Sequence, residues 1–471
     1  MGVDAAPVTI SQEELERYGL KPQYVPTEHS VASVSDKITS LVTAPRPRPW
    51  WWALFLVGGG LSTLFAGVVT YLLVRGVGIW GINVPVAWGF AITSFVWWIG
   101  IGHAGTLISA FLLLMHQKWR TSINRLAEAM TVFAVMTAGL FPLLHLGRPW
   151  FLYWLLPYPD TMGLWPQFRS ALVWDVFAVS TYLLVSLLFW YMGMIPDLAK
   201  LRDRSSSTAW RSFYGVLAMG WRNSARHWHR YETTYLLLAG LATPLVVSVH
   251  SVVSSDFASS LVPGWHETVF PPYFVAGAIL SGFAMVLVLC IPIRVAYGVQ
   301  EFITRDHLDV MGKLLLVTSL VTSYGYLSEQ TVTYYGGDVY DTHVYWYRLT
   351  DFAKYGWFVW ILFSCNTIVP QLLWIRALRR NQAVLFGVSL LVLVGMWLER
   401  YMIVTSSLSE DFLPSSWGFF KPTLWDILTF AGSIGFFMVP FLLFVRYLPL
   451  MSISETQALL PGAHGSEVGR A

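Results

Sequence analysis

Ten stretches of this chain are long and apolar enough to cross a lipid bilayer, and this constrains the fold more than any other feature. A membrane-spanning helix needs about 20 consecutive, mostly apolar residues. Only 12% of the 471 residues are charged, whereas a soluble domain carries about 25%. Helices are expected, because backbone polar groups must be paired within lipid. The predicted spans are 50–74, 84–116, 126–146, 169–194, 231–252, 272–297, 310–334, 352–376, 383–405 and 423–447. The second, sixth and seventh are long and are expected to tilt or to extend beyond the lipid.

The distribution of Lys and Arg predicts the orientation of these spans. Of the 30 Lys and Arg residues, 23 fall on the side that holds both tails and the loops after even-numbered spans. Basic residues accumulate on the cytoplasmic side of a membrane protein. Both termini are therefore expected in the cytoplasm, with a polar N-terminal tail over 1–49 and a C-terminal tail over 448–471. The tail after Met451 is expected to be mobile.

Two pairs of similar segments predict an internal repeat. Ala104-Gly105-Thr106-Leu107-Ile108-Ser109-Ala110-Phe111 in the second span resembles Ala276-Gly277-Ala278-Ile279-Leu280-Ser281-Gly282-Phe283 in the sixth. The fifth span leaves through Ser-Ser-Asp-Phe at 254–257, and the ninth through Ser-Glu-Asp-Phe at 409–412. The expected fold is an all-α polytopic membrane protein with two related four-helix bundles, about 84–252 and 272–405, plus two flanking helices. Chance similarity among small-residue membrane segments is the alternative.

Most ionisable residues near the span ends fall on the non-cytoplasmic side, which is periplasmic if the chain resides in a bacterial inner membrane. An ionisable group in lipid is costly and is found mainly where it functions. His145 and Asp175 are the first candidates for a site, because each lies at or inside an otherwise apolar span. The further candidates are Arg148, His250, Asp256, Glu399, Arg400, Glu329 and Asp426.

Imidazoles and carboxylates at the end of an apolar bundle are suited to a polar head whose tail lies in lipid, and a quinol fits this description. Quinol oxidation releases two protons and two electrons, and a His or carboxylate can accept a proton as the electron leaves. Structural roles compete with this interpretation: Asp256 and Asp426 are also suited to capping helix ends, and Arg148 to binding a helix terminus or a lipid phosphate.

His103 lies near mid-depth in the second span, so it is a candidate for a proton path together with Glu329 and Asp426. A core histidine bonded to a neighbouring helix is the alternative. A single b-type haem would need a His pair at similar depth on facing helices, and His145 with His250 is the pair to consider. Both residues lie at span ends, and no second pair is evident, so no haem or metal is expected.

Three further features concern the surface. The segment 208–225 mixes aromatic and basic residues, as an interfacial helix or an ordinary loop would. The loop 335–351 holds Asp338, Asp341, His343 and Asp351 among aromatic residues; a metal site is one interpretation, and a protein-docking surface is favoured. Nothing in the sequence points to nucleic-acid binding.

Several of these motifs resemble the NrfD/PsrC family of integral quinol-interacting subunits, and within it the ActC-type subunits of alternative complex III. The resemblance rests on Gly102-His103-Ala104-Gly105, on His145-Leu146-Gly147-Arg148-Pro149 and above all on the run from Glu399-Arg400-Tyr401 to Ser415-Ser416-Trp417-Gly418. It covers roughly residues 50–447.

The resemblance implies that menaquinol or another quinol binds near the periplasmic face. It implies electron transfer to a periplasmic iron–sulfur subunit, then to c-type haem subunits, beside a paralogous membrane subunit. The predicted function is therefore a quinol-binding and quinol-oxidising membrane subunit that releases or translocates protons. A non-catalytic, proton-conducting anchor of the ActF type remains as one alternative. A secondary transporter is the other, although transporters usually bind substrate at the midplane.

Overall fold

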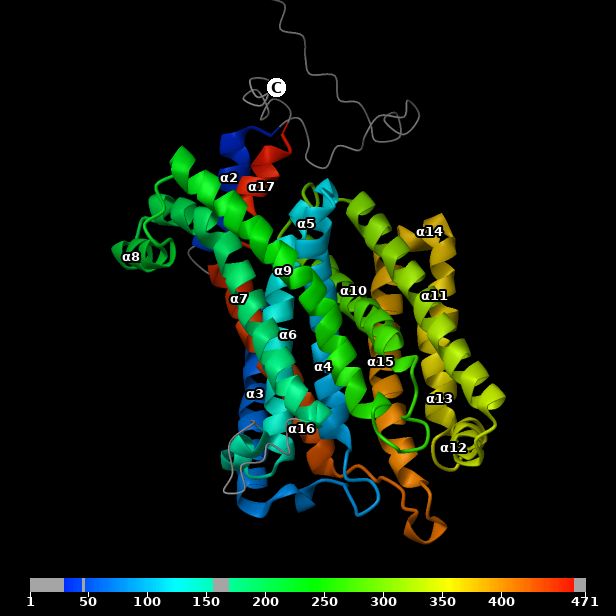
Figure 1. Ribbon diagram of the computed structural model, residues 1–471. Helices are drawn as coiled ribbons and strands as arrows, with labels where there is room; N and C mark the ends of the chain where they lie inside the picture. Colours follow the sequence, from blue (N-terminus) through cyan, green and yellow to red (C-terminus); the bar gives the residue numbers. More distant parts are fainter. Residues whose placement is uncertain (1–28, 45–46, 156–168, 461–471) are drawn as a thin grey trace, which may run out of the picture.

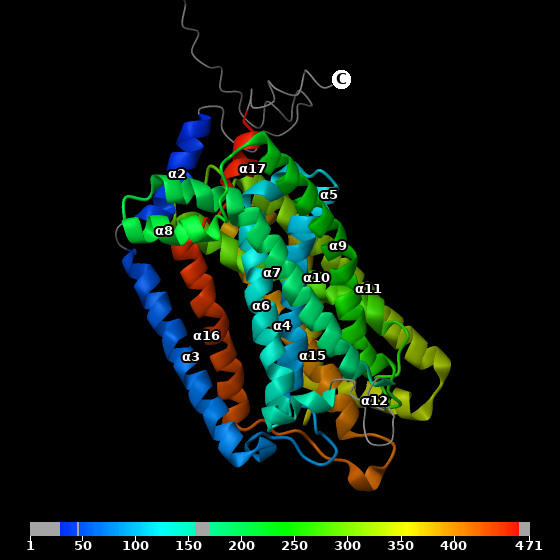
Figure 2. The same cartoon turned by 60° about the vertical axis from the view of Figure 1, so that its left-hand side comes forward.

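The computed structural model describes residues 29–44, 47–155 and 169–460. Among these residues, ten helices are long and apolar enough to cross a membrane, and they run side by side as a bundle (Figures 1 and 2). The expected all-α membrane fold is confirmed. The spans are α3 (Pro49–Arg75), α4–α5 (Phe90–Leu114), α6 (Asn124–His145), α7 (Ala171–Arg204), α9 (Ala225–Ala258), α10 (Phe270–Ala296), α11 (Arg305–Gly336), α13 with its continuation (Gly356–Trp374), α15 (Gln382–Ser409) and α16 (Leu424–Tyr447).

The helices form two groups of four with α4 and α10 packed against each other at the centre. One group comprises α4, α6, α7 and α9, and the other α10, α11, α13 and α15. The flanking helices α3 and α16 pack against each other, and α16 joins the pair to α4 and α6. A Cβ on Gly282 of α10 would lie 2.5 Å from the Ala104 Cβ and 2.8 Å from the Ala104 backbone nitrogen of α4. Glycine is therefore needed where these two central helices touch.

Two spans change their helical pitch. Between α4 (Phe90–Thr106) and α5 (Leu112–Leu114), residues Leu107–Phe111 form a π-helical turn. After α13 (Gly356–Phe363), the π-helical turn Ser364–Ile368 leads into the 3₁₀ segment Val369–Trp374 and the short helix α14 (Arg376–Arg379). Such π-helical turns inside α-helices are found frequently at functional sites.

The predicted span lengths need one correction. The longest helices are α7 and α9, with 34 residues each, and α11, with 32. The second and sixth spans are shorter, with 25 and 27. Polar residues follow the apolar part of α7 and precede that of α9, so these helices continue past the segments that hydropathy detects.

Both predicted tails contain helices. Within the N-terminal tail, α2 (Val31–Thr43) packs against α7 and α16, and also against α17 (Ile453–Ala458) of the C-terminal tail. The expectation of a mobile chain after Met451 is wrong for 453–458, because Ser454 hydrogen-bonds to Asp197 of α7 and Glu455 to Asn124 of α6. Residues 1–28 and 461–471 lie outside the described part of the chain.

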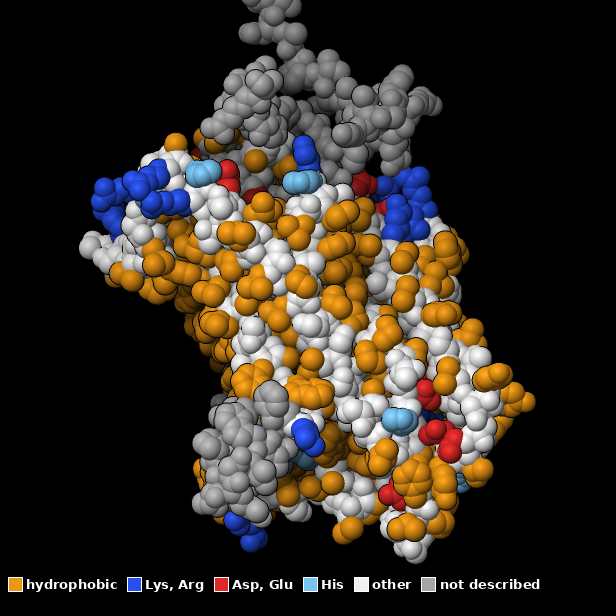
Figure 3. Space-filling view, viewed as in Figure 1, with side chains coloured by type: hydrophobic (Ala, Val, Ile, Leu, Met, Phe, Trp, Pro, Cys, Tyr) orange, Lys and Arg blue, Asp and Glu red, His pale blue; other side chains and the backbone are white. Residues whose placement is uncertain are grey.

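Two short helices lie across the bundle rather than along it. α8 (Thr208–Leu217) lies beside the ends of α7 and α9, and α12 (Val339–Thr350) lies at the other end of the molecule (Figure 1). α2, α8 and α17 share one end, where most Lys and Arg side chains in Figure 3 gather. We call it the basic end, and the other the opposite end. α8 lies within 208–225 and agrees with the helical interpretation of that segment. α12 lies within 335–351, where a loop was predicted.

Candidate functional site

Near the opposite end, α4, α6 and α7 enclose a cavity of about 480 Å³. Pockets for small organic ligands typically measure roughly 300–1,000 Å³ and combine apolar walls with a few polar groups. The polar groups here include His145, Asp175 and Asp256. Apolar side chains make up most of the wall, among them Ile92, Phe95, Leu140, Leu143, Val176, Val179, Leu183 and Phe436. A flat, largely apolar head group with polar atoms at its edge matches this lining.

His145 enters the cavity from the last residue of α6. Gly147 follows with φ 66°, and a Cβ there would lie 2.7 Å from the Val77 side chain, so only glycine lets the chain turn away at this point. Trp88 meets the His145 ring edge-on, with centroids 6.4 Å apart. The His145 Nδ1 atom is buried and has no hydrogen-bond partner among the described residues. This nitrogen is therefore open to a ligand in the cavity.

Asp175 and Asp256 meet across the interface between α7 and α9. Their side chains form a hydrogen bond with each other. An ionised carboxylate can only accept hydrogen bonds, so one of the two groups must carry a proton. The Oδ1 atoms of both residues are buried without another partner in the described chain. The pair thus presents a shared proton and free acceptor oxygens beside the cavity.

His250 lies elsewhere than predicted. α9 continues to Ala258, so His250 lies two turns inside the helix and is fully buried. Its ring is 4.6 Å from that of His103 on α4, measured between centroids. Neither His250 nitrogen has a hydrogen-bond partner among the described residues, whereas His103 Nδ1 lies 2.8 Å from the Ile99 carbonyl oxygen. His250 therefore pairs with His103 inside the first group of helices, and not with His145 as considered for a haem.

Glu399 and Arg400 also lie away from the cavity, in the second group of helices. Their side chains form an ion pair at 2.7 Å. The Tyr326 hydroxyl donates to Glu399 Oε2 at 2.5 Å and accepts from Asn366 Nδ2 at 2.8 Å. The Arg400 guanidinium lies 4.1 Å above the ring of Phe274. That ring is 5.8 Å from the His250 ring, so the network borders the histidine pair.

The remaining predicted residues have separate surroundings. Glu329 pairs with Arg348 at 3.3 Å beside a niche of about 60 Å³. Arg148 is exposed and is not among the cavity residues. Asp426 Oδ2 accepts hydrogen bonds from the backbone of Gly81 and Thr423, which satisfies the start of α16 as a helix cap does. The cavity thus gathers three of the predicted residues, His145, Asp175 and Asp256.

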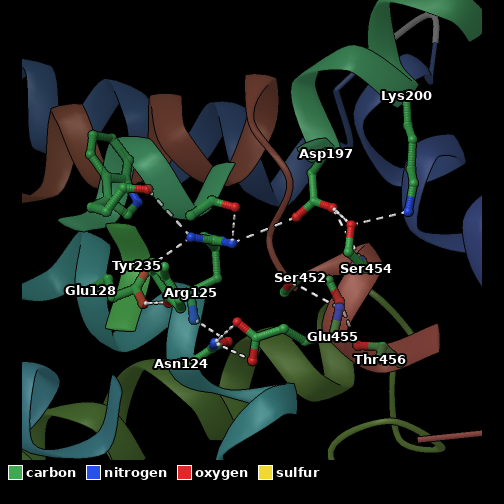
Figure 4. A network of polar contacts seen from close by, with 12 residues as sticks. Asn124, Arg125, Glu128, Asp197, Lys200, Tyr235, Ser452, Ser454, Glu455 and Thr456 are labelled. Atoms are coloured by element: carbon green, nitrogen blue, oxygen red, sulfur yellow. Dashed lines mark hydrogen bonds and ion pairs between the residues drawn. The ribbon is translucent and has the colours of Figure 1, made fainter. Parts of the chain in front are cut away.

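A second buried polar cluster lies toward the basic end and was missed by the sequence analysis (Figure 4). Arg125 of α6 is fully buried; it donates to Glu128 at 2.9 Å and lies 3.6 Å from Asp197 of α7. Tyr235 of α9 donates to Glu128 at 3.0 Å. The sequence does hold a sign of this cluster: Arg125 and Glu128 are three residues apart at the start of an apolar helix, a spacing at which opposite charges pair. The third predicted span began at 126 and the fourth ended at 194, so Arg125 and Asp197 fell just outside the predicted spans.

The C-terminal helix α17 completes this cluster. Glu455 accepts hydrogen bonds from Arg120 at 2.8 Å and from Asn124 at 3.2 Å. Asp197 accepts from the Ser454 hydroxyl at 3.0 Å, and Lys200 donates to the same hydroxyl at 3.1 Å (Figure 4). Buried ionisable groups are therefore not confined to the opposite end, where most of them were predicted. α6, α7, α9 and α17 place a second group near the other end.

No group of three or more His, Cys, Asp or Glu side chains in the described residues is arranged to hold a metal ion. The side chains of the cavity itself offer hydrogen bonding and proton transfer, through His145 and the Asp175–Asp256 pair.

The fold and site define a polytopic membrane protein with a largely apolar cavity that holds three ionisable groups near one end. Comparison with known proteins then identifies the family: residues 80–409 match the family described as "Polysulphide reductase, NrfD". The chain belongs to the NrfD family. The resemblance noted in the sequence is thereby confirmed at this level.

Two relatives are similar over most of their length. A protein of Halobacterium salinarum described as a membrane subunit of dimethyl sulfoxide reductase is 27% identical over 437 residues, which are 85% of this chain and 94% of that protein. A selenate reductase subunit of Mesobacillus selenatarsenatis is 23% identical over 400 residues, which are 80% and 89% of the two chains. Both are named as subunits of reductases, which coarsely supports a role for this chain in an oxidoreductase complex.

Proposed function

We propose that this chain is the quinol-binding and quinol-oxidising membrane subunit of a bacterial quinol:electron-acceptor oxidoreductase. The observation that carries the proposal is the cavity of about 480 Å³, where apolar walls surround His145 and the Asp175–Asp256 pair. The apolar wall suits a quinol ring and the start of its tail, and the polar groups suit its two hydroxyls.

Oxidation of one quinol to a quinone releases two protons and two electrons. His145 Nδ1 is an available acceptor for one proton. The carboxylate of the Asp175–Asp256 pair accepts the other, because the pair holds a single shared proton. Each group acts as a general base while the electrons leave. The proposed acceptor of the electrons is an iron–sulfur subunit docked at the opposite end, as the resemblance to ActC-type subunits implies.

The other predicted residues take supporting roles in this proposal. Arg148 follows the cavity residue Leu146 by two positions and is exposed, so we assign it to the rim of the site. His250 and His103 carry protons away from the cavity, and the Glu399–Arg400 network, with Glu329, extends the polar route. Asp426 is the weakest member of this route, because its hydrogen bonds are those of a helix cap.

We further propose that the complex is an alternative complex III, with menaquinol as the donor. Its other members are a periplasmic iron–sulfur subunit, a set of c-type haem subunits and a paralogous membrane subunit. The support is the similarity of the run from Glu399 to Gly418 to ActC-type subunits. The relatives named as reductase subunits fit the same role, since a reductase needs an electron donor.

The orientation follows from the basic residues. We assign the basic end to the cytoplasm and the cavity to the periplasmic side of a bacterial inner membrane, because Lys and Arg are retained on the cytoplasmic side. α2 and α17, which neighbour the two termini in the sequence, lie at that end (Figure 1).

Turnover of the purified complex tests the proposal. Quinol-dependent reduction of its redox centres is compared between the native protein, His145→Ala and Asp175→Asn. Both variants are expected to assemble and to slow reduction by about 100-fold or more, the range of general-base losses. The control is Ser186→Ala, a small buried change on α7 at a residue that does not line the cavity. Native rates in both variants would show that the cavity does not oxidise quinol.

A second candidate function is that of a non-catalytic, proton-conducting anchor. The buried cluster of Arg125, Glu128 and Asp197 favours it, because ionisable groups within a span commonly line ion pathways. This candidate predicts that His145→Ala leaves quinol oxidation intact, whereas Glu128→Gln reduces proton transfer across liposomes that contain the complex.

A further inference from the structure

The surface formed by α8 and the start of α9 combines exposed apolar side chains with exposed arginines. Trp210, Phe213 and Val216 are spaced three residues apart on α8, and their side chains are 41%, 47% and 77% exposed. Met219 follows in the turn and is 72% exposed. Large apolar side chains gathered on one surface mark contact with lipid or with another protein.

This apolar surface is held firmly in place. The Tyr214 hydroxyl donates to the Tyr447 carbonyl oxygen of α16 at 3.0 Å, and Trp210 stacks on the Tyr447 ring at 5.3 Å. The Tyr191 hydroxyl of α7 donates to the Leu217 carbonyl oxygen at 2.7 Å. Contacts with α7 and α16 therefore fix the position of α8, while its apolar side chains stay exposed.

The arginines lie directly after α8. Arg222, Arg226 and Arg230 are exposed on the turn after α8 and on the first turns of α9. The backbone nitrogen of Arg222 donates to His227 Nδ1 at 3.2 Å, and Trp228 Nε1 donates to Asn223 at 2.7 Å, which fixes the turn. In Figure 3 basic side chains gather at this corner, with hydrophobic side chains directly below them.

Two of these arginines lie where positive charge is unfavourable for α9. Arg226 lies at the N-terminus of α9, where the helix dipole favours negative charge. Arg226 and Arg230 are four residues apart on one face, and like charges at that spacing repel. The acidic residues nearby are Asp203, which pairs with Arg202, and Glu232, which is exposed and lies on another face of α9. An anion beside Arg226 and Arg230 would relieve both unfavourable interactions.

We propose that α8 and these three arginines form a binding site for anionic phospholipid at the membrane surface of the basic end. The headgroup phosphate is held by Arg222, Arg226 and Arg230, and the acyl chains lie against Phe213 and Val216. The apolar surface continues along the span helices with exposed Leu187 and Leu188 of α7 and Leu236 and Leu237 of α9. That continuity and the positive charge select a lipid over a soluble protein as the occupant.

Two measurements on the full complex in lipid nanodiscs test the proposal. First, a nitroxide label on Val216→Cys is probed with oxygen and with a water-soluble nickel complex. The two native cysteines are buried. Collision with oxygen rather than nickel is expected. Access to nickel, or shielding from both reagents by a covering protein, would overturn the lipid assignment.

Second, spin-labelled phosphatidylglycerol and phosphatidylcholine are compared for the fraction immobilised by the protein. The native complex is expected to retain phosphatidylglycerol preferentially, and the preference should fall by about fivefold for each arginine changed in Arg226→Gln/Arg230→Gln. The control Lys37→Gln/Lys118→Gln removes the same charge elsewhere at the basic end and should keep the preference. Equal retention of the two lipids by the native complex, or equal loss in both variants, would refute a specific site.

Discussion

Arg125 of α6 lies 3.6 Å from Asp197 of α7, and the second bundle has an ion pair with the charges exchanged: Asp309 of α11 lies 2.8 Å from Arg379 of α14. In the first bundle the pair joins the start of α6 to the end of α7, and in the second it joins the start of α11 to α14, which follows the third span. The arrangement fits the predicted duplication of a four-helix unit, since two copies can keep a salt bridge while swapping its partners.

Removing Arg125 should destabilise the protein strongly. Arg125→Leu leaves Glu128 and Asp197 buried without their cation, and breaking a buried pair in this way costs about 3–5 kcal/mol. Thermal unfolding in detergent measures the effect. Arg204→Leu is the matched control, because the pair between Arg204 and Asp36 is exposed and should contribute under about 1 kcal/mol. An equal fall in unfolding temperature in both variants would show that the buried cluster stabilises the protein no more than an exposed ion pair.

Asp175 and Asp256 should behave as one unit in catalysis. Each of Asp175→Asn and Asp256→Asn removes the shared proton site, so the double variant should be no slower than the slower single variant. Quinol oxidation rates of the four proteins give the coupling. Effects that multiply in the double variant would mean that the two carboxyl groups act independently.

Contact between the two central helices should depend on Gly282. A side chain there meets the Ala104 backbone within 2.8 Å, so Gly282→Val should separate α4 and α10 and cost about 1–3 kcal/mol or more. Unfolding temperature and yield report the change. Gly240→Val is the control: a Cβ there has open space around it, and valine has a higher helix propensity than glycine, so this change should be neutral or slightly stabilising. A native unfolding temperature for Gly282→Val would show that α4 and α10 can accommodate a side chain at this contact.

Glu267, between α9 and α10, should make stability depend on pH. Burial, with a smaller contribution from Asp341, raises the pKa of Glu267 above its usual value. The unfolded chain therefore loses this proton at lower pH than the folded protein does. Stability should fall as pH rises from about 4.3, the ordinary Glu pKa, and level off above the folded pKa. Melting curves at several pH values measure this dependence, and Glu267→Gln should weaken the fall in stability with pH. An unchanged fall in the variant would show that other groups cause it.

Hydropathy was sufficient to predict the ten helices, but their ends were set by polar residues that it does not detect. Extending α9 to Ala258 moved His250 from the expected rim into the interior beside His103. It also put Asp256 on the helix, where it meets Asp175. Which helix ends meet is decided by packing between segments far apart in the sequence, so the division of the polar residues into a cavity and separate networks needed the structure.

Photolabelling with an azido-quinone is the most direct test of the central claim that a quinone head occupies the cavity lined by His145, Asp175 and Asp256. The complex is labelled in the membrane and digested, and the modified residues are identified by mass spectrometry. The account predicts labels on cavity residues such as Met136, Leu140, Leu143 or Val179, and their loss when excess unlabelled quinone is present. Competed labelling confined to the second bundle, for example around Tyr326 and Glu329, with none at the cavity, would contradict it.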